Sequence, residues 1–410
     1  MVSSPASPSD SVSFWQARSG WLPGKAEVVV IGGGLLGVSA AYWLAEAGLE
    51  PLLLEAGVPG AGASGRNAGF VGPGLAVSYQ QAVATLGRAQ AREVYRSTLG
   101  NVDLVRQLVA KEDIDCELSA DGQLSLAVGQ GQWDAKRKQA ELLAADGFPT
   151  DVVEREELAR FIGTPVAAHV AGGLYRPNAM SINPMRLVSA LTHAARRRGA
   201  QIMTGVQVRS IAHIHGRIHL ETSTGPLNCS AAVVAVNAWT PALVPQTAGL
   251  ITPARAQMLA YAPAAPVFHT PTGASVSPTG EYWRQLADGR IIVGGRRDLD
   301  IGFATTAQTP TDEVQAAVEQ VLPGLFPELD LPPVTTRWAG AMARTPDQLP
   351  IAGPVPDVPR AWFALGCNGH GVAFAAFLGH ALAQAVIDGH MPDALRPFSL
   401  DRPTLNGPSG

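Results

Sequence analysis

The clearest pattern of apolar and polar positions lies over residues 28–55, near the start of the chain. A run of β-branched residues at 28–31 predicts a strand, and an apolar stretch over 35–47 predicts a helix. A second apolar run at 52–54 predicts another strand, which ends in Glu55. The pattern therefore predicts a strand, turn, helix and strand unit with an acidic residue at its far end.

The turn of this unit carries a glycine motif, because residues 32–37 fit the spacing G-x-G-x-x-G. Gly32 allows the tight turn, Gly34 lets backbone N–H groups approach a pyrophosphate, and Gly37 lets the helix pack close to the sheet. The helix start supplies free N–H donors for phosphates, and Glu55 can accept hydrogen bonds from a ribose. The unit therefore predicts a dinucleotide site, for either NAD or FAD.

A segment of small residues at 60–69 follows directly, with Ser64, Arg66 and Asn67 as its only polar side chains. Small residues let the backbone pass close to a flat or charged group. The alternative is a flexible surface linker. Because apolar residues flank the segment and the acidic residue precedes it, we favour a loop that lines the cofactor.

The rest of the chain shows helical and strand patterns of two kinds, which indicate two domains. Residues 76–165 lack a nucleotide motif and indicate a second domain, which residues 249–335 continue as a mostly antiparallel sheet with one helix. The segment between them returns to the first pattern from about residue 172. We predict helices over 80–111, 132–145, 184–198 and 311–321, and strands over 123–128, 202–204, 207–211, 231–236, 255–261, 281–285, 290–294 and 361–365.

A second glycine loop, at 366–371, lies between the strand predicted at 361–365 and a final apolar helix. Its spacing does not fit a phosphate motif, and no ribose-binding acid follows. A helix N-terminus that points at a cofactor can instead stabilise negative charge forming on it. The N1–C2=O edge of a reduced flavin carries such a charge.

Composition narrows the function further. With 410 residues, 46% apolar and 16% charged, the chain is typical of a globular protein with a large core and two or three domains. The net charge of −4 excludes a general basic field for nucleic acid. The three cysteines are far apart, which indicates neither a disulfide framework nor a metal site and fits a reducing compartment.

Targeting segments are not apparent. Residues 1–20 contain no apolar run of the kind found in a secretory signal. The apolar stretch at 371–387 is interrupted by His380 and Gln384, so it predicts a buried helix and no membrane span. We therefore expect a cytoplasmic protein.

Taken together, these residues resemble the D-amino-acid oxidase-type FAD oxidoreductases, a group that includes glycine oxidase, sarcosine oxidases and γ-glutamylputrescine oxidase. The resemblance runs from Phe14 to about Asp388 and rests on the segments 32–55, 62–69, 235–239, 281–290 and 366–371. The Arg66–Asn67 loop, the Tyr282 segment and the loop at 369–371 are most similar to the γ-glutamylputrescine oxidase branch.

The resemblance implies an α/β fold with a Rossmann-type, glutathione-reductase-like FAD-binding domain. This domain is interleaved with an α+β substrate domain built on a mostly antiparallel sheet. The expected division is a leader over 1–24, FAD-binding segments over 25–75, 166–245 and 336–390, substrate-domain segments over 76–165 and 246–335, and a tail over 391–410.

The resemblance also implies positions for FAD. Glu55 would bind the adenosine ribose, and the backbone of Val208 would contact adenine. The loop around Ser64 would follow the pyrophosphate and flavin, while Gly340 and the loop at 366–372 would border the isoalloxazine. The residues expected to bind FAD are Gly32, Gly34, Leu35, Leu36, Gly37, Glu55, Ala56, Ala63, Ser64, Gly65, Arg66, Asn67, Ala68, Val208, Asn237, Trp239, Gly340, Gly366, Asn368, Gly369, His370, Gly371 and Val372.

The sequence departs from the family at several positions. Glycine oxidase and its relatives hold the substrate carboxylate with two arginines, whose places are taken here by Met342 and Gly369. Planar bidentate donors are needed for such a clamp, and the arginines that could replace them are Arg284, Arg296 and Arg344.

Two further departures concern the flavin and oxygen. Monomeric sarcosine oxidases link the flavin to a cysteine near the position of Gly340. The absence of that cysteine implies non-covalent FAD. The same enzymes activate oxygen with a lysine that matches Ile292 here, which weakens the oxidase interpretation relative to a dehydrogenase.

The implied reaction is oxidation of a C–N bond in a small amine or amino acid. Candidate catalytic residues are His370, Arg66, Tyr282 and Arg284. His370 either acts in the active site or only holds the loop and flavin, and Arg66 either meets the flavin or substrate or makes a phosphate or structural contact. Tyr282 and Arg284 are expected on one face of a strand.

Three functions remain open at this point. The first is an FAD-dependent amine or amino-acid oxidase that reduces O2 to H2O2. The second is a related dehydrogenase or imine-forming biosynthetic enzyme with another electron acceptor. The third is a flavin- or nucleotide-binding electron carrier with no oxidation of its own.

Overall fold

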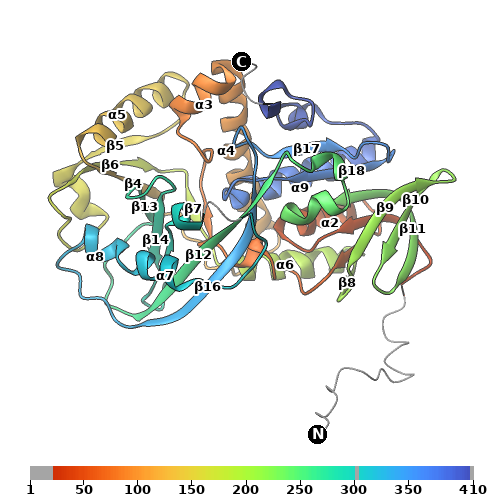
Figure 1. Cartoon of the computed structure of the whole chain (residues 1–410), viewed down its shortest axis with the longest axis horizontal. Helices are drawn as coiled ribbons and strands as arrows, with labels where there is room; N and C mark the ends of the chain where they lie inside the picture. The colour runs from red at the N-terminus through yellow and green to blue at the C-terminus, as the bar shows by residue number, and fades with distance from the viewer. Residues whose placement is uncertain (1–21, 301–303, 407–410) are drawn as a thin grey trace, which may run out of the picture.

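The computed structural model describes residues 22–300 and 304–406. The leader predicted over 1–24 therefore lies almost entirely outside the described residues. Within them, two large sheets stand side by side, the first on the right and the second on the left of Figure 1. No helix in these ranges is long and apolar enough to cross a membrane.

The first sheet has the strand order β17-β18-β11-β1-β2-β8, and the five strands from β18 to β8 run parallel. A meander of β9 and β10 joins it through β11, and β17 pairs with β18 in the antiparallel direction. The strands are β1 (Lys25–Ile31), β2 (Leu52–Glu55), β8 (Gln201–Thr204), β9 (Val208–Ile214), β10 (Arg217–Thr222), β11 (Gly225–Val234), β17 (Ile351–Pro354) and β18 (Ala361–Leu365).

The side chains of β1 point alternately to the two faces of this sheet, and a different set of elements covers each face. Val28 and Val30 pack into the core formed with helices α2 (Leu35–Glu46), α6 (Pro184–Arg197) and α9 (Ala375–Asp388). Val29 and Ile31 point to the opposite face, where they meet side chains from the β9–β11 meander. All four valine and isoleucine side chains are buried, which explains why the run reads as continuously apolar.

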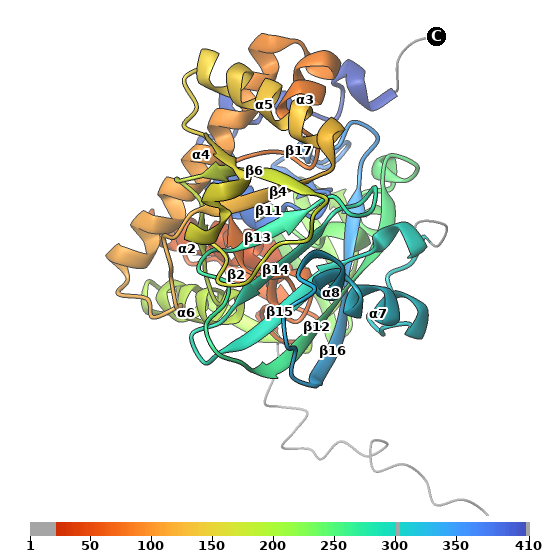
Figure 2. The ribbon, with the colours of Figure 1, turned by 90° about the vertical axis from the view of Figure 1, so that its left-hand side faces the viewer.

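The second sheet has the order β16-β12-β15-β14-β13-β4-β6-β5 and is antiparallel except for the β13–β4 pair. Helices α7 (Asp312–Glu319) and α8 (Val321–Leu325) cover its outer face around Trp283 (Figure 2). The strands are β4 (Gln123–Val128), β5 (Asp151–Glu154), β6 (Val170–Arg176), β12 (Thr252–Pro263), β13 (Thr272–Ala274), β14 (Glu281–Gln285), β15 (Arg290–Gly295) and β16 (Val334–Arg344), and a separate ribbon pairs β3 (Phe70–Val71) with β7 (Met180–Ser181).

Three helices, α3 (Tyr79–Leu86), α4 (Arg88–Lys111) and α5 (Gln130–Ala145), lie between and beside the sheets. The single helix expected over 80–111 is wrong, because Gly87 adopts a φ of +78° and breaks it. Buried side chains of α4 join the core of the first sheet, and α5 packs against β4 and β6. The segment 76–165 thus connects the two units.

The strands also correct two expected segment limits. β6 lies within the segment 166–245 assigned to the first domain, but it pairs with β4 and β5 in the second sheet. Gly172 makes this strand difficult to recognise in the sequence. Glycine is needed at this position because a Cβ would lie 2.7 Å from the Trp133 ring. Similarly, β16 begins at Val334 and pairs with β12, although residue 336 was the expected start of an FAD-binding segment.

The predicted tail over 391–410 packs on the first unit as far as residue 406. Two short 3-10 helices, Asp393–Phe398 and Pro403–Asn406, form part of it. Leu395 and Phe398 are buried in the first core. Arg402 forms a buried ion pair with Asp347, with Nε 2.6 Å from Oδ2.

Candidate functional site

The turn between β1 and α2 has the geometry that its glycines predict. Gly32 adopts a φ of +106°, and a Cβ there would lie 2.6 Å from the carbonyl oxygen of Ala235. A Cβ at Gly37 would overlap the carbonyl oxygen of Gly32. These two positions therefore need glycine, because the chain turns sharply and α2 packs directly on the turn.

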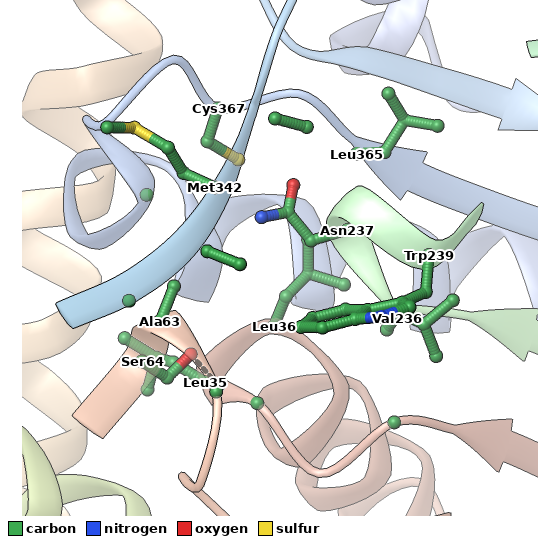
Figure 3. Close-up of a pocket in the computed structure, with 18 of the residues that line it drawn as sticks. Leu35, Leu36, Ala63, Ser64, Val236, Asn237, Trp239, Met342, Leu365 and Cys367 are labelled. Carbon is green, nitrogen blue, oxygen red and sulfur yellow. Dashed lines mark hydrogen bonds between the residues drawn. The ribbon is translucent and has the colours of Figure 1, made fainter. Parts of the chain in front are cut away.

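The N-terminus of α2 is left open for an anion. Gly34 is its N-cap and supplies no side-chain cap, and the first turn contains no acidic residue. From the loop at 60–69, the Ser64 hydroxyl accepts a hydrogen bond of 2.9 Å from the Leu35 N–H (Figure 3). The positive end of the helix dipole thus lies beside Ser64, as a phosphate site requires.

Glu55 ends β2 beside the same turn. Its two carboxylate oxygens accept hydrogen bonds from the N–H groups of Gly33 and Gly57, at 2.6 and 2.8 Å. These bonds fix the carboxylate, and its remaining lone pairs can accept the hydroxyls of a ribose.

The loop at 60–69 is held by its own polar side chains. The Asn67 amide donates to the carbonyl oxygens of Ala63 and Ser64 and accepts from the Gly69 N–H. Arg66 donates through Nε to the Ala61 carbonyl and through Nη1 to the Ala339 carbonyl on β16. These contacts fix Arg66 structurally while its side chain still lines the cavity described next.

A cavity of about 560 Å³ lies where β1, β2, β11 and β18 end, and it extends to the inner face of the second sheet. Ligands of open α/β sheets bind at this edge. Eighteen of the residues expected to bind FAD line it: Gly32, Gly34, Leu35, Leu36, Glu55, Ala56, Ala63, Ser64, Arg66, Asn67, Val208, Asn237, Trp239, Gly340, Asn368, Gly369, Gly371 and Val372. Gly37, Gly65, Ala68, Gly366 and His370 do not line it.

The second glycine loop is fixed by asparagines. The Asn368 carboxamide, which is buried, accepts from the Thr345 N–H at 2.8 Å and donates to the Gly366 carbonyl. Asn237 accepts from the Gly366 N–H at 3.1 Å. After the loop, the helix expected to begin near Gly371 starts as a 3-10 turn and becomes α9 at Ala375.

Figure 3 shows how these elements enclose the cavity. Asn237 and Trp239 lie opposite the start of α2 at Leu35, while Met342 and Cys367 lie on the side away from α2. Burial raises the pKa of Cys367 to about 12, so the thiol is neutral. One end of the cavity therefore belongs to the nucleotide turn and the other to β16 and the second glycine loop.

Strand β14 places its side chains as the alternation predicts. Tyr282 lines the cavity, whereas Trp283 packs in the core beneath α7 and α8. Arg284 is on the Tyr282 side but does not reach the cavity; it is buried and donates to the Ile182 carbonyl at 2.7 Å. Burial raises the pKa of Tyr282 and lowers the pKa of Arg284 to about 10.

The His370 side chain, on the second glycine loop, is exposed to solvent, and protein atoms surround it at longer range. Desolvation by this surrounding protein lowers the pKa of His370 to about 4, and the positive charge of Arg297 contributes in the same direction. The imidazole is therefore neutral near pH 7 and can act as a hydrogen-bond donor or acceptor.

Arg297 is a cavity residue that the sequence did not identify. Its Nη1 lies 3.2 Å from the position a Cβ of Gly369 would occupy, and Met342 Sδ lies 3.3 Å from the same position. The guanidinium thus stands beside the two positions where the family's arginines were expected. Arg296, one of the proposed replacements, lines neither of the two principal cavities and pairs with Asp298.

A turn explains why Arg297 lines the cavity and the preceding residue, Arg296, does not. Arg296 has a φ of +52°, and a 3-10 helix from Arg297 to Asp300 follows. This left-handed residue ends the alternation of β15, so the strand pattern could not tell which arginine faces the cavity.

The lining of the first cavity suits a dinucleotide with an aromatic ring system. It combines an uncapped helix start, a fixed carboxylate and, at the far end, the small residues Gly340 and Gly369. Its volume falls in the range of about 300–1,000 Å³ typical of ligand sites. The residues present therefore fit FAD.

Comparison with known proteins gives consistent results. Residues 27–385 match the sequence model of the DAO family, described as FAD dependent oxidoreductase. A probable oxidoreductase, OrdL, from Rhizobium meliloti (strain 1021) is 30% identical over 378 residues, which cover 89% of this chain and 84% of the relative. The gamma-glutamylputrescine oxidoreductase of Escherichia coli (strain K12) is 27% identical over 385 residues, covering 87% and 83%.

Among solved structures, glycine oxidase from Geobacillus kaustophilus superposes with a TM-score of 0.79. The match covers 93% of this chain and 99% of that chain at 22% identity. At this identity the likeness shows the fold, and it confirms the α/β fold class expected from the sequence.

Proposed function

Because the chain belongs to the DAO family of FAD-dependent oxidoreductases, we propose that it oxidises a C–N bond of an amine or amino acid. Family membership confirms the predicted cofactor, FAD, and the prediction of an enzyme. It argues against the non-catalytic electron carrier. The observation that carries the proposal is that the nucleotide turn and the inner face of the second sheet line one continuous cavity.

FAD would supply the hydride acceptor for the carbon next to the substrate nitrogen, and hydrolysis of the imine product would give a carbonyl compound and an amine. We further propose that FAD is held without a covalent bond, since the residue on β16 next to the Arg66 loop is Gly340. In the oxidase form of this proposal, O2 would be the electron acceptor and H2O2 the product.

The chain's own residues favour the reactive form of an amine. The charged side chains that line the first cavity are Glu55, Arg66 and Arg297, and Glu55 lies at the nucleotide end. The positive charge of Arg297 near Tyr282 and Met342 disfavours a bound ammonium and thus favours the neutral amine. Tyr282, kept as a neutral phenol by burial, can donate a hydrogen bond to the substrate.

A dehydrogenase with another electron acceptor is the second candidate. One observation favours it, because none of the described residues that line the two principal cavities is a lysine. Ile292, which takes the place of the oxygen-activating lysine, is buried among Ala68 and Met258. This position therefore supplies no cation that could activate oxygen.

Anaerobic mixing of the FAD-loaded enzyme with a panel of amines, N-methyl amino acids and D-amino acids tests both candidates. The proposal predicts bleaching of the flavin by at least one of these compounds, followed by rapid return of colour and H2O2 on admission of air. Bleaching without rapid reoxidation would identify the dehydrogenase. If no amine bleaches the flavin, the proposed function is wrong.

A further inference from the structure

A second cavity of about 320 Å³ lies next to the first along strand β16. Met342 lines the first cavity, and Arg344, two residues further on, lines the second. Alternate residues of a strand share one face, so these two side chains project from the same side of β16, about 7 Å apart along it. Arg297 lines both cavities and marks where they meet.

The positive and negative charges around the second cavity do not balance. Arg255 is neutralised by Asp300, with Nε and Nη2 each within 2.8 Å of a carboxylate oxygen. Within the described residues, neither Arg297 nor Arg344 forms an ion pair. Arg297 donates to the Thr279 carbonyl at 2.6 Å. Among the residues that the structure describes, the cavity thus carries two guanidinium charges without a carboxylate partner.

The guanidinium groups of Arg297 and Arg344 repel each other at a partly buried site. Burial lowers the pKa of Arg344, and the nearby positive charge of Arg297 lowers it further. Like charges held close together cost free energy. An anion between them would remove this cost, and guanidinium groups bind carboxylates with two parallel hydrogen bonds.

We propose that Arg297 and Arg344 bind a carboxylate of the substrate that is separated by several bonds from the C–N bond undergoing oxidation. This rests on the proposed function. The separation between the carboxylate and the C–N bond follows from which residues line each of the two cavities. Arg344 lines the second cavity and not the first, so a carboxylate shared by Arg344 and Arg297 lies where the two cavities meet. A substrate that reaches both must span the position of Arg297.

Three five-carbon amines test this inference directly. 5-Aminopentanoate carries a distant carboxylate, 2-aminopentanoate an adjacent one, and pentylamine none. We expect kcat/KM to be at least about tenfold higher for 5-aminopentanoate than for the other two, since a charged hydrogen-bond pair contributes about 1.5–3 kcal/mol. Equal values for the three, or a preference for 2-aminopentanoate, would overturn the proposal.

Matched variants identify the residues responsible. Arg297→Gln and Arg344→Gln should each reduce the ratio of kcat/KM for 5-aminopentanoate to that for pentylamine by about tenfold or more. Arg290→Gln makes the same change in charge at the start of β15, where the side chain is exposed and pairs with Asp288. This control should keep the ratio of the unaltered protein. A ratio that the cavity variants leave unchanged contradicts the inference.

A binding measurement separates this inference from the proposed function. Glutarate presents the same terminal carboxylate but has no amine to oxidise, and glutaramide is its neutral counterpart. At constant ionic strength, glutarate should raise the melting temperature of the protein, glutaramide should not, and the Arg344→Gln variant should lose the effect. If glutarate binds in this way but no amine is oxidised, the carboxylate site stands and the proposed function fails. If amines are oxidised but glutarate has no effect, the carboxylate site is wrong.

Discussion

The turn at 32–37 and the loop at 366–371 both connect a parallel strand to a helix that faces the same cavity, yet different contacts hold them. In the first, glycines let α2 pack directly onto the turn, and Glu55 and Ser64 accept hydrogen bonds from its N–H groups. In the second, side chains distant in sequence hold the loop: Asn237 accepts a hydrogen bond from the Gly366 N–H, and the Thr345 hydroxyl accepts one from the Asn368 amide. The first loop therefore depends on positions that only glycine can fill, whereas the second depends on the side-chain hydrogen bonds of Asn237 and Asn368.

This difference affects where each helix begins. α2 starts at Leu35, immediately after its N-cap Gly34, so its N–H groups open onto the cavity. α9 is preceded by a 3-10 turn at Gly371–Ala373 and begins only at Ala375. The first loop presents a helix end to the cavity, whereas the second presents loop backbone and the start of a 3-10 turn.

The largest expected effect is at the first loop. In Gly37→Ala, the new methyl group would overlap the Gly32 carbonyl, so we expect a loss of about 3 kcal/mol in unfolding free energy and little bound FAD. Urea unfolding and flavin absorbance measure both. Gly100→Ala, at an exposed position of helix α4, is the control, since nothing lies within 4 Å of its added Cβ; it should gain about 0.5–1 kcal/mol. Equal behaviour of the two variants would contradict the account of the turn.

A smaller effect is expected at the second loop. Asn368→Ala removes the bonds to Thr345 and Gly366 and places alanine at a φ of +54°, which should cost about 2 kcal/mol. Asn368→Gly suits this φ but also lacks the bonds, so it should recover less than half of the loss in urea unfolding. Full recovery by glycine would show that backbone conformation, and not the side-chain bonds, makes asparagine necessary.

The comparison also shows what the sequence can predict. The first unit was predicted closely, because the roles of residues 28–55 depend on neighbours in the chain. The strands β4, β14 and β18 were also placed at their observed limits, since they alternate or are continuously apolar. The bonds of Asn368 and the approach of Arg297 to Gly369 join residues distant in sequence, and no spacing encodes them.

Substitution at Glu55 tests the nucleotide end of the cavity alone. Glu55→Gln keeps the side-chain size but removes the charge that would accept ribose hydroxyls, so FAD should bind about 10- to 100-fold more weakly. Quenching of flavin fluorescence by the apoprotein gives the dissociation constant. Glu50→Gln, at an exposed position just before β2, is the control and should bind FAD normally. An unchanged affinity in Glu55→Gln would argue against the ribose contact.

The smallest effect concerns protonation of His370. With a folded pKa of about 4, below the ordinary value of 6.5, the unfolded chain binds more protons between these values. The contribution of His370 to stability is therefore complete above about pH 6.5 and is lost as pH falls towards 4. NMR titration, assigned by comparison with His370→Asn, should show a neutral ring at pH 6. A midpoint near 6.5 would show that the surrounding protein and Arg297 do not shift it.

The central claim is that the cavity shared by the two loops holds one FAD without a covalent bond. The flavin content of the purified protein, measured by absorbance before and after heat denaturation and filtration, tests it most directly. The account predicts about one flavin per chain, all of it released into the filtrate. Flavin that stays with the denatured protein would contradict non-covalent binding, and a chain that neither contains nor takes up FAD would contradict the assignment of the cavity.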